Sequence, residues 1–168
     1  MLALLFPGQG SQTPGMLDAW LDSDTKKMAA KWSLHIDLDL ERLGTSAPAD
    51  EIRDTANAQP LIVAAGIIGA NRFGLDLCAD AGVITGHSVG EITAATIAGV
   101  ISQVDALSLV RQRGIAMAKA ASASETGMAA VLGGERKEVL QAIEANNLIP
   151  ANDNGAWQIV AAGALIDL

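Results

Sequence analysis

The first part of the chain alternates short apolar runs with glycine-rich breaks. Residues 2–6, LALLF, form an apolar run that stops at Pro7 and the loop PGQGSQTPG. Residues 82–85, GVIT, form a second run that stops at another glycine-rich segment, GHSVG. The pattern predicts two short buried strands, each of which ends at a glycine-rich loop.

Helical periodicity appears between and after these two runs. Residues 18–43 mix charged residues with apolar residues at helical spacing, which predicts surface helices. The apolar stretch after Pro60, residues 61–74, predicts a largely buried helix. Two further helices are expected at residues 89–99, which are mostly small or β-branched, and at residues 104–121.

The last part of the chain has a β-α-β rhythm of its own. Residues 128–134 and 157–163 are predicted strands, and residues 135–147, ERKEVLQAIEANN, form a predicted amphipathic helix. The segment SASETG breaks the helical pattern before this rhythm begins. We therefore expect an α/β protein with two subdomains, residues 1–125 and residues 126–168.

The segment TGHSVGE places Ser88 between a predicted strand and a predicted helix, in the pattern Gly-x-Ser-x-Gly. A serine hydroxyl is a poor nucleophile unless it is exposed and provided with a base and oxyanion donors. A tight turn between strand and helix exposes the hydroxyl, and larger residues at Gly86 and Gly90 would collide. The helix start favours negative charge, and the backbone N–H of Val89 can donate to an oxyanion. Ser88 is therefore a candidate nucleophile.

The alternative is that Ser88 only caps the helix, a common role for serine at a helix start. The two histidines of the chain do not decide between these interpretations. His87 is adjacent to Ser88 on a tight turn and points elsewhere, and His35 lies in a predicted surface helix. Neither histidine is expected to act as the general base for Ser88.

Charge and composition exclude several classes of partner. The formal net charge is −8 without any basic run, which argues against nucleic acid. No stretch reaches the roughly 20 apolar residues of a membrane helix, and the N-terminus lacks the features of a signal peptide. The single cysteine, Cys78, cannot form an intramolecular disulfide, which suits a reduced environment. We therefore expect a cytoplasmic protein with no nucleic-acid or membrane partner.

Five segments share the order and spacing of a known enzyme family. They are FPGQGSQ from Phe6, GHSVGE from Gly86, LVRQRGIAM from Leu109, GMAAVLGG and ANDNGAWQIVAAG. Together they resemble the malonyl-CoA:acyl carrier protein transacylase family of fatty acid synthesis. The resemblance implies an α/β-hydrolase-like subdomain with a parallel sheet and a nucleophile elbow, followed by an incomplete ferredoxin-like α+β subdomain.

The resemblance also implies a two-step acyl transfer. Ser88 matches the family's nucleophile, which takes a malonyl group from malonyl-CoA and passes it to the pantetheine thiol of acyl carrier protein. Gln9 and Val89 match the residues whose backbone N–H groups form the oxyanion hole. Arg113 matches the arginine that pairs with the malonyl carboxylate, a task that suits its charged, forked side chain. Helical spacing alone does not select Arg113, because Arg111 lies nearer the middle of the apolar face. The resemblance implies no metal site and no permanently bound cofactor.

The family's general base is a histidine that follows the second subdomain, and neither His35 nor His87 matches it. We therefore expect the 168-residue chain to be the N-terminal portion of the enzyme and to acylate Ser88 slowly on its own. An interrupted sheet would also expose apolar edges and favour self-association. Two alternatives stay open: a serine thioester hydrolase, and a non-catalytic fragment that needs a complementary C-terminal chain.

Overall fold

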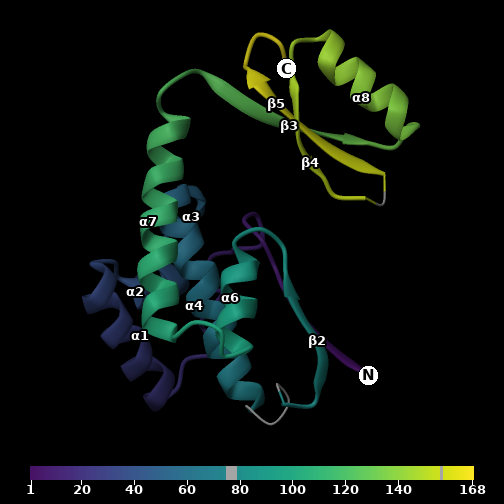
Figure 1. The fold of residues 1–168 in the computed structure, drawn as a ribbon. Helices are drawn as coiled ribbons and strands as arrows, with labels where there is room; N and C mark the ends of the chain where they lie inside the picture. The colour runs from purple at the N-terminus through teal and green to yellow at the C-terminus, as the bar shows by residue number, and fades with distance from the viewer. Residues whose placement is uncertain (75–78, 156) are drawn as a thin grey trace. The chain divides into compact units, whose positions relative to one another are not determined.

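The computed structural model describes residues 1–74, 79–155 and 157–168, so the expectation for Cys78 lies outside the described residues. The chain divides into two compact units, Met1–Ala118 and Lys119–Leu168 (Figure 1). The first unit contains a parallel sheet and the second an antiparallel sheet. This mixture of helices and sheets confirms the predicted α/β class in outline.

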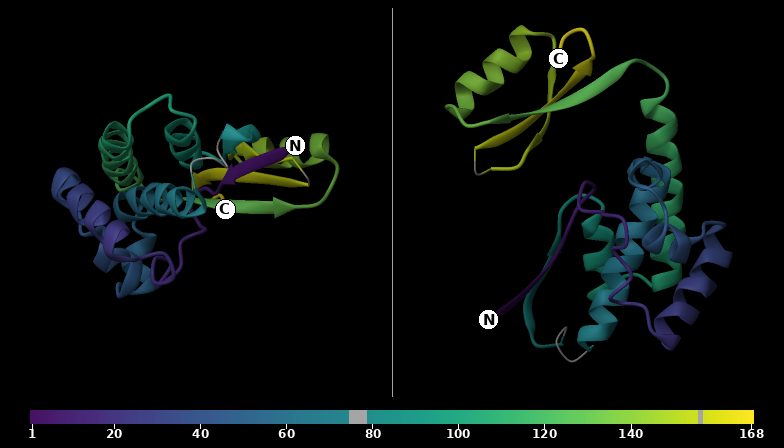
Figure 2. Two further views of the ribbon diagram at one scale, coloured as in Figure 1. Left: turned by 90° about the horizontal axis from the view of Figure 1, so that it is seen from below. Right: turned by 180° about the vertical axis from the view of Figure 1, so that it is seen from behind.

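The first unit is a two-stranded parallel sheet with helices packed against it in succession. Helix α6 packs against both strands, α4 packs against α6, and α2 and α3 pack against α4 (Figures 1 and 2). Because the strands are parallel, their C-terminal ends meet at one edge of the sheet. The elements are β1 (Leu2–Phe6), α1 (Ser23–Ile36), α2 (Leu40–Thr45), α3 (Ala49–Arg53), α4 (Thr55–Phe73), β2 (Ala81–Gly86), α6 (Gly90–Ile97) and α7 (Gln103–Ala121).

Helix α4 supplies much of the core of the first unit. Its apolar residues from Leu61 to Ile68 include several that are fully buried, as a largely buried helix requires. The expected start after Pro60 is wrong, because the helix begins at Thr55. Asp54 caps this start by accepting a hydrogen bond from the backbone N–H of Ala56 at 2.8 Å. Pro60 therefore lies inside the helix, where it lacks the N–H that would bond to the carbonyl of Ala56.

An arginine of α7 replaces that missing donor. The Nη1 atom of Arg111 donates a hydrogen bond to the carbonyl oxygen of Ala56 at 2.9 Å. One turn further along α7, Gly114 lets the two helices approach closely, since an added Cβ would lie 2.9 Å from the carbonyl oxygen of Thr55. These contacts hold α7 against the N-terminal end of α4.

Helix α1 and most of α2 lie within residues 18–43, where the periodicity predicts helices, and each helix buries an apolar face. Trp32 and Ile36 of α1, with Leu40 and Leu43 of α2, belong to the same core cluster as α4. The exposed faces carry the charged residues. These are amphipathic helices on the surface of the core.

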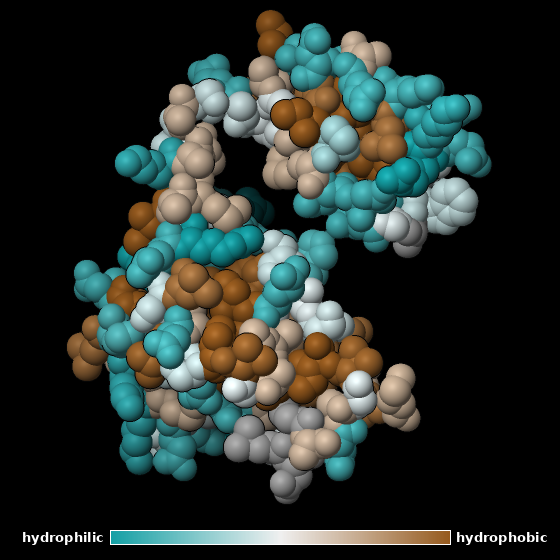
Figure 3. Space-filling model, viewed as in Figure 1, coloured by the Kyte–Doolittle hydropathy of each residue, from teal (hydrophilic) through white to brown (hydrophobic). Residues whose placement is uncertain are grey.

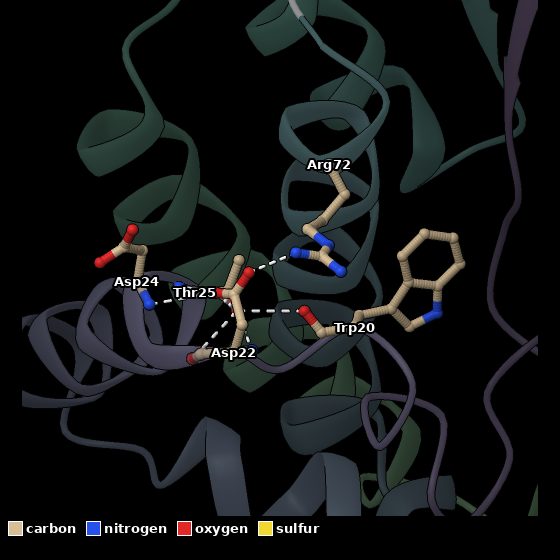
Figure 4. A network of polar contacts seen from close by, with 5 residues as sticks. All are labelled: Trp20, Asp22, Asp24, Thr25 and Arg72. Atoms are coloured by element: carbon tan, nitrogen blue, oxygen red, sulfur yellow. Dashed lines mark hydrogen bonds and ion pairs between the residues drawn. The ribbon is translucent and has the colours of Figure 1, made fainter.

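Asp22 connects the start of α1 to the end of α4 (Figure 4). Its Oδ1 atom accepts hydrogen bonds from the backbone N–H groups of Asp24 and Thr25 at 3.0 and 2.9 Å, while its own N–H donates to the Thr25 hydroxyl at 2.7 Å. Its Oδ2 atom pairs with the guanidinium of Arg72 on α4. The bonds from Thr25 and Asp24, together with the charge of Arg72, lower the pKa of Asp22 to about 2.

The second unit is a three-stranded antiparallel sheet with one helix. Its elements are β3 (Thr126–Leu132), α8 (Arg136–Ala145), β4 (Ile149–Asp153) and β5 (Gln158–Ala164), and the strand order is β3-β5-β4. The strand β4 was not anticipated, because Pro150 and Asn152 are unusual in strands. Proline is tolerated there because β4 is an edge strand that pairs only with β5 among the described strands. Ile143 of α8 packs with Ile159 and Ala161 of β5 in a small core.

Considerable apolar surface stays exposed in both units. Figure 3 shows hydrophobic residues at the surface between polar ones, and the exposed large apolar side chains include Leu5, Phe73 and Leu132. Within the described ranges, no helix is both long enough and apolar enough to cross a membrane.

We predict that the pH dependence of stability reports on Asp22. Its carboxylate stays ionised in the folded state down to about pH 2, whereas its ordinary pKa is 3.8. The stabilisation is therefore complete above that ordinary value and is lost as the pH falls toward 2. Asp22→Asn should lower the free energy of unfolding at pH 7, and the gap to the wild type should close between about pH 4 and pH 2. Urea unfolding followed by circular dichroism measures this gap, and a gap independent of pH would contradict the assignment.

We also predict a coupling between Arg111 and Pro60. Arg111→Met should cost about 1–2 kcal/mol of unfolding free energy, because it leaves the Ala56 carbonyl without a donor. Adding Pro60→Ala should recover much of that loss, since residue 60 then regains the N–H that bonds to Ala56. A double-mutant cycle in urea measures the coupling. Strictly additive effects would show that Arg111 does not substitute for the missing N–H.

Candidate active site

Ser88 lies on the sharp turn between β2 and α6. Its φ of 53° is in the left-handed region, which is strained for a residue with a side chain and costs about 1–3 kcal/mol. The turn is held by hydrogen bonds from the N–H of His87 to the carbonyl of Phe6 at 3.0 Å and from the N–H of Gly90 to the carbonyl of His87 at 2.9 Å. The sharp turn leaves the Ser88 side chain exposed at the end of the sheet.

The two glycines of the turn are required for steric reasons, as the sequence predicts. A Cβ on Gly86 would lie 2.1 Å from the backbone carbon of Gly90. A Cβ on Gly90 would lie 2.3 Å from the carbonyl oxygen of Phe6. A side chain at Gly90 would therefore force the turn away from the end of β1, and a side chain at Gly86 would force the end of β2 away from the start of α6.

The loop after β1 lies against the same turn. A Cβ on Gly8 would be 2.5 Å from Nδ1 of His87 and 2.9 Å from its carbonyl oxygen, so the loop and the His87 ring are in close contact. Gln9 follows in this loop and is exposed, while the Val89 side chain at the start of α6 is fully buried. The parallel pairing of β1 and β2 thus brings the Gln9 loop and the Ser88 turn to the same edge of the sheet.

Arg113 of α7 reaches Ser88. Its Nη2 atom donates a hydrogen bond to Oγ of Ser88 at 3.3 Å, and its Nη1 atom donates to Oε1 of Gln59 at 2.5 Å. Arg111, which lies nearer the middle of the apolar face, contacts the Ala56 carbonyl instead. The structure therefore brings Arg113, but not Arg111, to the candidate nucleophile.

Gln59 is a site residue that the sequence analysis missed. It lies on α4, is 1% exposed, and donates from Nε2 to Oε1 of Gln9 at 3.2 Å and to the sulfur of Met117 at 3.1 Å. Gln9 in turn donates to Oγ1 of Thr55 at 3.1 Å. The sequence does contain a signal for Gln59, since it is a polar residue directly before a buried apolar run. A buried polar group needs hydrogen-bond partners, and these can belong to a site. A continuous chain of polar contacts thus links Gln9, Gln59, Arg113 and Ser88.

The two histidines have other contacts in the structure. Nε2 of His35 on α1 hydrogen-bonds to Oγ of Ser108 on α7 at 2.7 Å, in an exposed position. The His87 ring lies against Gly8 in the loop after β1. In the described part of the chain, no group of three or more His, Cys, Asp or Glu side chains is placed to hold a metal ion.

These residues form a small cationic site at the end of the parallel sheet. An exposed hydroxyl sits at the N-terminal end of α6, beside a guanidinium that a buried amide holds in place. A guanidinium can bind a carboxylate through two parallel hydrogen bonds. The arrangement can therefore hold an anionic substrate next to a serine hydroxyl.

Curated proteins of known name match this chain in sequence. The malonyl CoA-acyl carrier protein transacylase of Mycobacterium bovis is 54% identical over 172 residues, and that of Escherichia coli K12 is 34% identical over 167 residues. These alignments cover 100% and 96% of this chain, but 57% and 54% of the relatives. The chain thus spans about half the length of the curated relatives it matches.

Solved structures agree with the sequence relatives. A crystal structure of MCAT from Mycobacterium tuberculosis matches with a TM-score of 0.92 at 54% identity and covers 98% of this chain and 56% of that one. An acyl-carrier-protein S-malonyltransferase from Bartonella henselae matches with a TM-score of 0.86 at 34% identity, over 99% of this chain and 56% of its own. The family model described as the acyl transferase domain matches residues 3–167. The chain therefore belongs to the acyl transferase domain family.

Proposed function

We propose that the protein to which this chain belongs transfers a malonyl group from coenzyme A to acyl carrier protein. Ser88 attacks the thioester carbonyl of malonyl-CoA, the carbon–sulfur bond breaks, and coenzyme A leaves as its thiol. The pantetheine thiol of acyl carrier protein then attacks the seryl ester and regenerates the Ser88 hydroxyl. The observation that carries the proposal is the contact between Arg113 and Ser88 at 3.3 Å, because it puts a carboxylate-binding cation beside the nucleophile.

The backbone N–H groups of Gln9 and Val89 are the proposed donors to the oxyanion that forms on the thioester carbonyl. Val89 is the N-cap residue of α6, where the helix dipole favours negative charge. The loop that carries Gln9 is packed against the Ser88 turn through Gly8 and His87. Two donors from separate, fixed segments are preorganised and lower the barrier without rearrangement.

Gln59 is the proposed positioning residue for Arg113. Its buried Oε1 accepts from one amino group of the guanidinium, while the other amino group points at Ser88. The second contact is long for a hydrogen bond, so a carboxylate can replace the hydroxyl as the partner of Arg113. A guanidinium donates hydrogen bonds and accepts none, so Arg113 cannot serve as the general base. The proton of Ser88 therefore goes to another group, and the family resemblance assigns that role to a histidine.

Several further features belong to the same proposal. The first subdomain, residues 1–125, is proposed to be α/β-hydrolase-like, and residues 126–168 to be part of a ferredoxin-like subdomain. The turn at Ser88 and the antiparallel sheet with α8 support these two assignments respectively.

Acyl carrier protein is the proposed partner and the cytoplasm the proposed location. Self-association is proposed for the chain alone, supported by its exposed apolar side chains.

We predict that Ser88 carries the acyl group. Incubated with malonyl-CoA, the chain should gain the mass of one malonyl group slowly, because Arg113 donates to Ser88 Oγ and cannot accept its proton, and neither His35 nor His87 matches the family's histidine base. Ser88→Ala should gain none. Intact-mass spectrometry over a time course measures both. Equal labelling of Ser88→Ala would contradict the nucleophile, and rapid stoichiometric labelling of the wild type would contradict the need for a further base.

We predict that Arg113 selects the carboxylate. Arg113→Met should lower the ratio of malonyl-CoA to acetyl-CoA acylation by about 10- to 100-fold, the value of charge-assisted hydrogen bonds worth about 1.5–3 kcal/mol. Gln59→Leu should lower the same ratio less, since the arginine remains but is no longer held. Gln112→Met, at an exposed position on the same helix, is the control and should leave the ratio unchanged.

The same acylation assay with the two thioesters measures these ratios. A ratio that survives Arg113→Met would show that another group binds the carboxylate. Thioester hydrolysis in the absence of acyl carrier protein, faster than transfer in its presence, would identify a hydrolase instead.

A further inference from the structure

The loop after β1 contains a tight turn over residues 8–11. The backbone N–H of Ser11 donates to the carbonyl oxygen of Gly8 at 3.3 Å and closes this turn. Gly10 takes the third position with a φ of 106°, which favours glycine and is typical of a type II turn. Gln9, whose backbone N–H is a proposed oxyanion donor, is therefore the second residue of the turn.

The side chain of Ser11 holds the peptide group that carries the Gln9 N–H. Its Oγ atom donates a second hydrogen bond to the carbonyl oxygen of Gly8, at 2.8 Å. This carbonyl and the Gln9 N–H belong to the same peptide group, which is planar and trans. Because the C=O and N–H bonds of such a group point in opposite directions, a side chain that fixes the carbonyl also fixes the direction of the N–H.

The side chain of Gln12 holds the next peptide group of the turn. Its Oε1 atom accepts from the N–H of Gly10 at 2.8 Å, and its Nε2 atom donates to the carbonyl oxygen of Ile52 on α3 at 3.1 Å. Ile52 is buried, so this bond ties the turn to the core. The Gly10 N–H is thus occupied, whereas the Gln9 N–H donates to no backbone carbonyl within the described ranges. The turn leaves the Gln9 N–H available to an oxyanion.

We propose that Ser11 is a positioning residue for the oxyanion hole, a role that rests on the proposed function of Gln9. The Ser11 hydroxyl aims the Gln9 N–H by holding the Gly8 carbonyl on the other side of the same peptide group. It also makes this N–H a stronger donor, because hydrogen bonds in a chain polarise one another. Ser11 acts through the peptide group and makes no bond to the reacting atoms itself. A donor whose direction is fixed before the reaction stabilises the developing charge without reorganisation.

Nuclear magnetic resonance tests the positioning without any substrate. Relaxation of the ¹⁵N-labelled chain measures the order parameter of the Gln9 N–H, which should fall from ~0.85, the value of rigid backbone, to roughly 0.6 in Ser11→Ala. Ser11→Thr keeps the hydroxyl at an exposed position and should restore the rigid value. Ser122→Ala is the matched control, because it removes the same kind of bond elsewhere, from a serine hydroxyl to the Lys119 carbonyl at 2.9 Å. A Gln9 N–H that stays rigid in Ser11→Ala would overturn the proposal.

The rate of Ser88 acylation tests the role in the reaction. Ser11→Ala should lower the maximal rate with malonyl-CoA about 10-fold, which is less than the loss of a whole oxyanion donor, and should leave the half-saturating concentration unchanged. The ratio of malonyl-CoA to acetyl-CoA acylation should also stay the same, because Arg113 is untouched. Ser11→Thr should recover most of the rate, and Ser122→Ala should not lower it.

Two results of the rate measurement would overturn the proposal. One is an unchanged maximal rate in Ser11→Ala although the Gln9 N–H has become mobile. The other is a weaker binding of malonyl-CoA that accounts for the whole effect. If Ser88 of the wild type takes no acyl group, the proposed function fails, and the order parameters still decide whether Ser11 holds the Gln9 N–H.

Discussion

The packing of the Ser88 turn on the end of β1 fixes the candidate nucleophile relative to the Gln9 loop and the start of α6. Only glycine fits at position 90, because a Cβ there would lie 2.3 Å from the carbonyl oxygen of Phe6. This contact joins the end of one parallel strand to the end of its neighbour and leaves Ser88 in a left-handed conformation. The loop with Gln9 and the start of α6 therefore lie at the same edge of the sheet as Ser88.

The buried amide of Gln59 on α4 connects the loop after β1 to α7. Gln59 is buried, so the oxygen and the nitrogen of its amide both need hydrogen-bond partners. Its Oε1 accepts from Arg113, and its Nε2 donates to Gln9 and Met117. α7 is held in place by two contacts with the start of α4, the Arg111 bond to Ala56 and the close approach at Gly114. The orientation of Arg113 toward Ser88 is thus a consequence of core packing, so the guanidinium is placed beside the hydroxyl in the absence of substrate.

The predictable parts of the structure are those specified by local pattern. The strand that ends at Phe6 and the glycine-flanked turn at Ser88 follow from apolar runs and from glycine sterics, which act over a few residues. The start of α4 before Pro60 was not predictable, because the helix tolerates this proline through a hydrogen bond from Arg111, far away in the sequence. Gln59 was missed for a related reason: its partners come from two segments far away in the sequence, the loop after β1 and α7. The choice of Arg113 over Arg111 came from family resemblance and not from helical spacing.

The central claim is that Ser88, Arg113 and Gln59 form one acyl site for a group that ends in a carboxylate. A crystal structure of the protein soaked with malonyl-CoA tests this claim most directly. The account predicts an ester on Ser88 whose carboxylate accepts hydrogen bonds from the Arg113 guanidinium, with Gln59 still bonded to that arginine. A malonyl group attached elsewhere, or a carboxylate that points to solvent while Arg113 stays on Ser88, would contradict it.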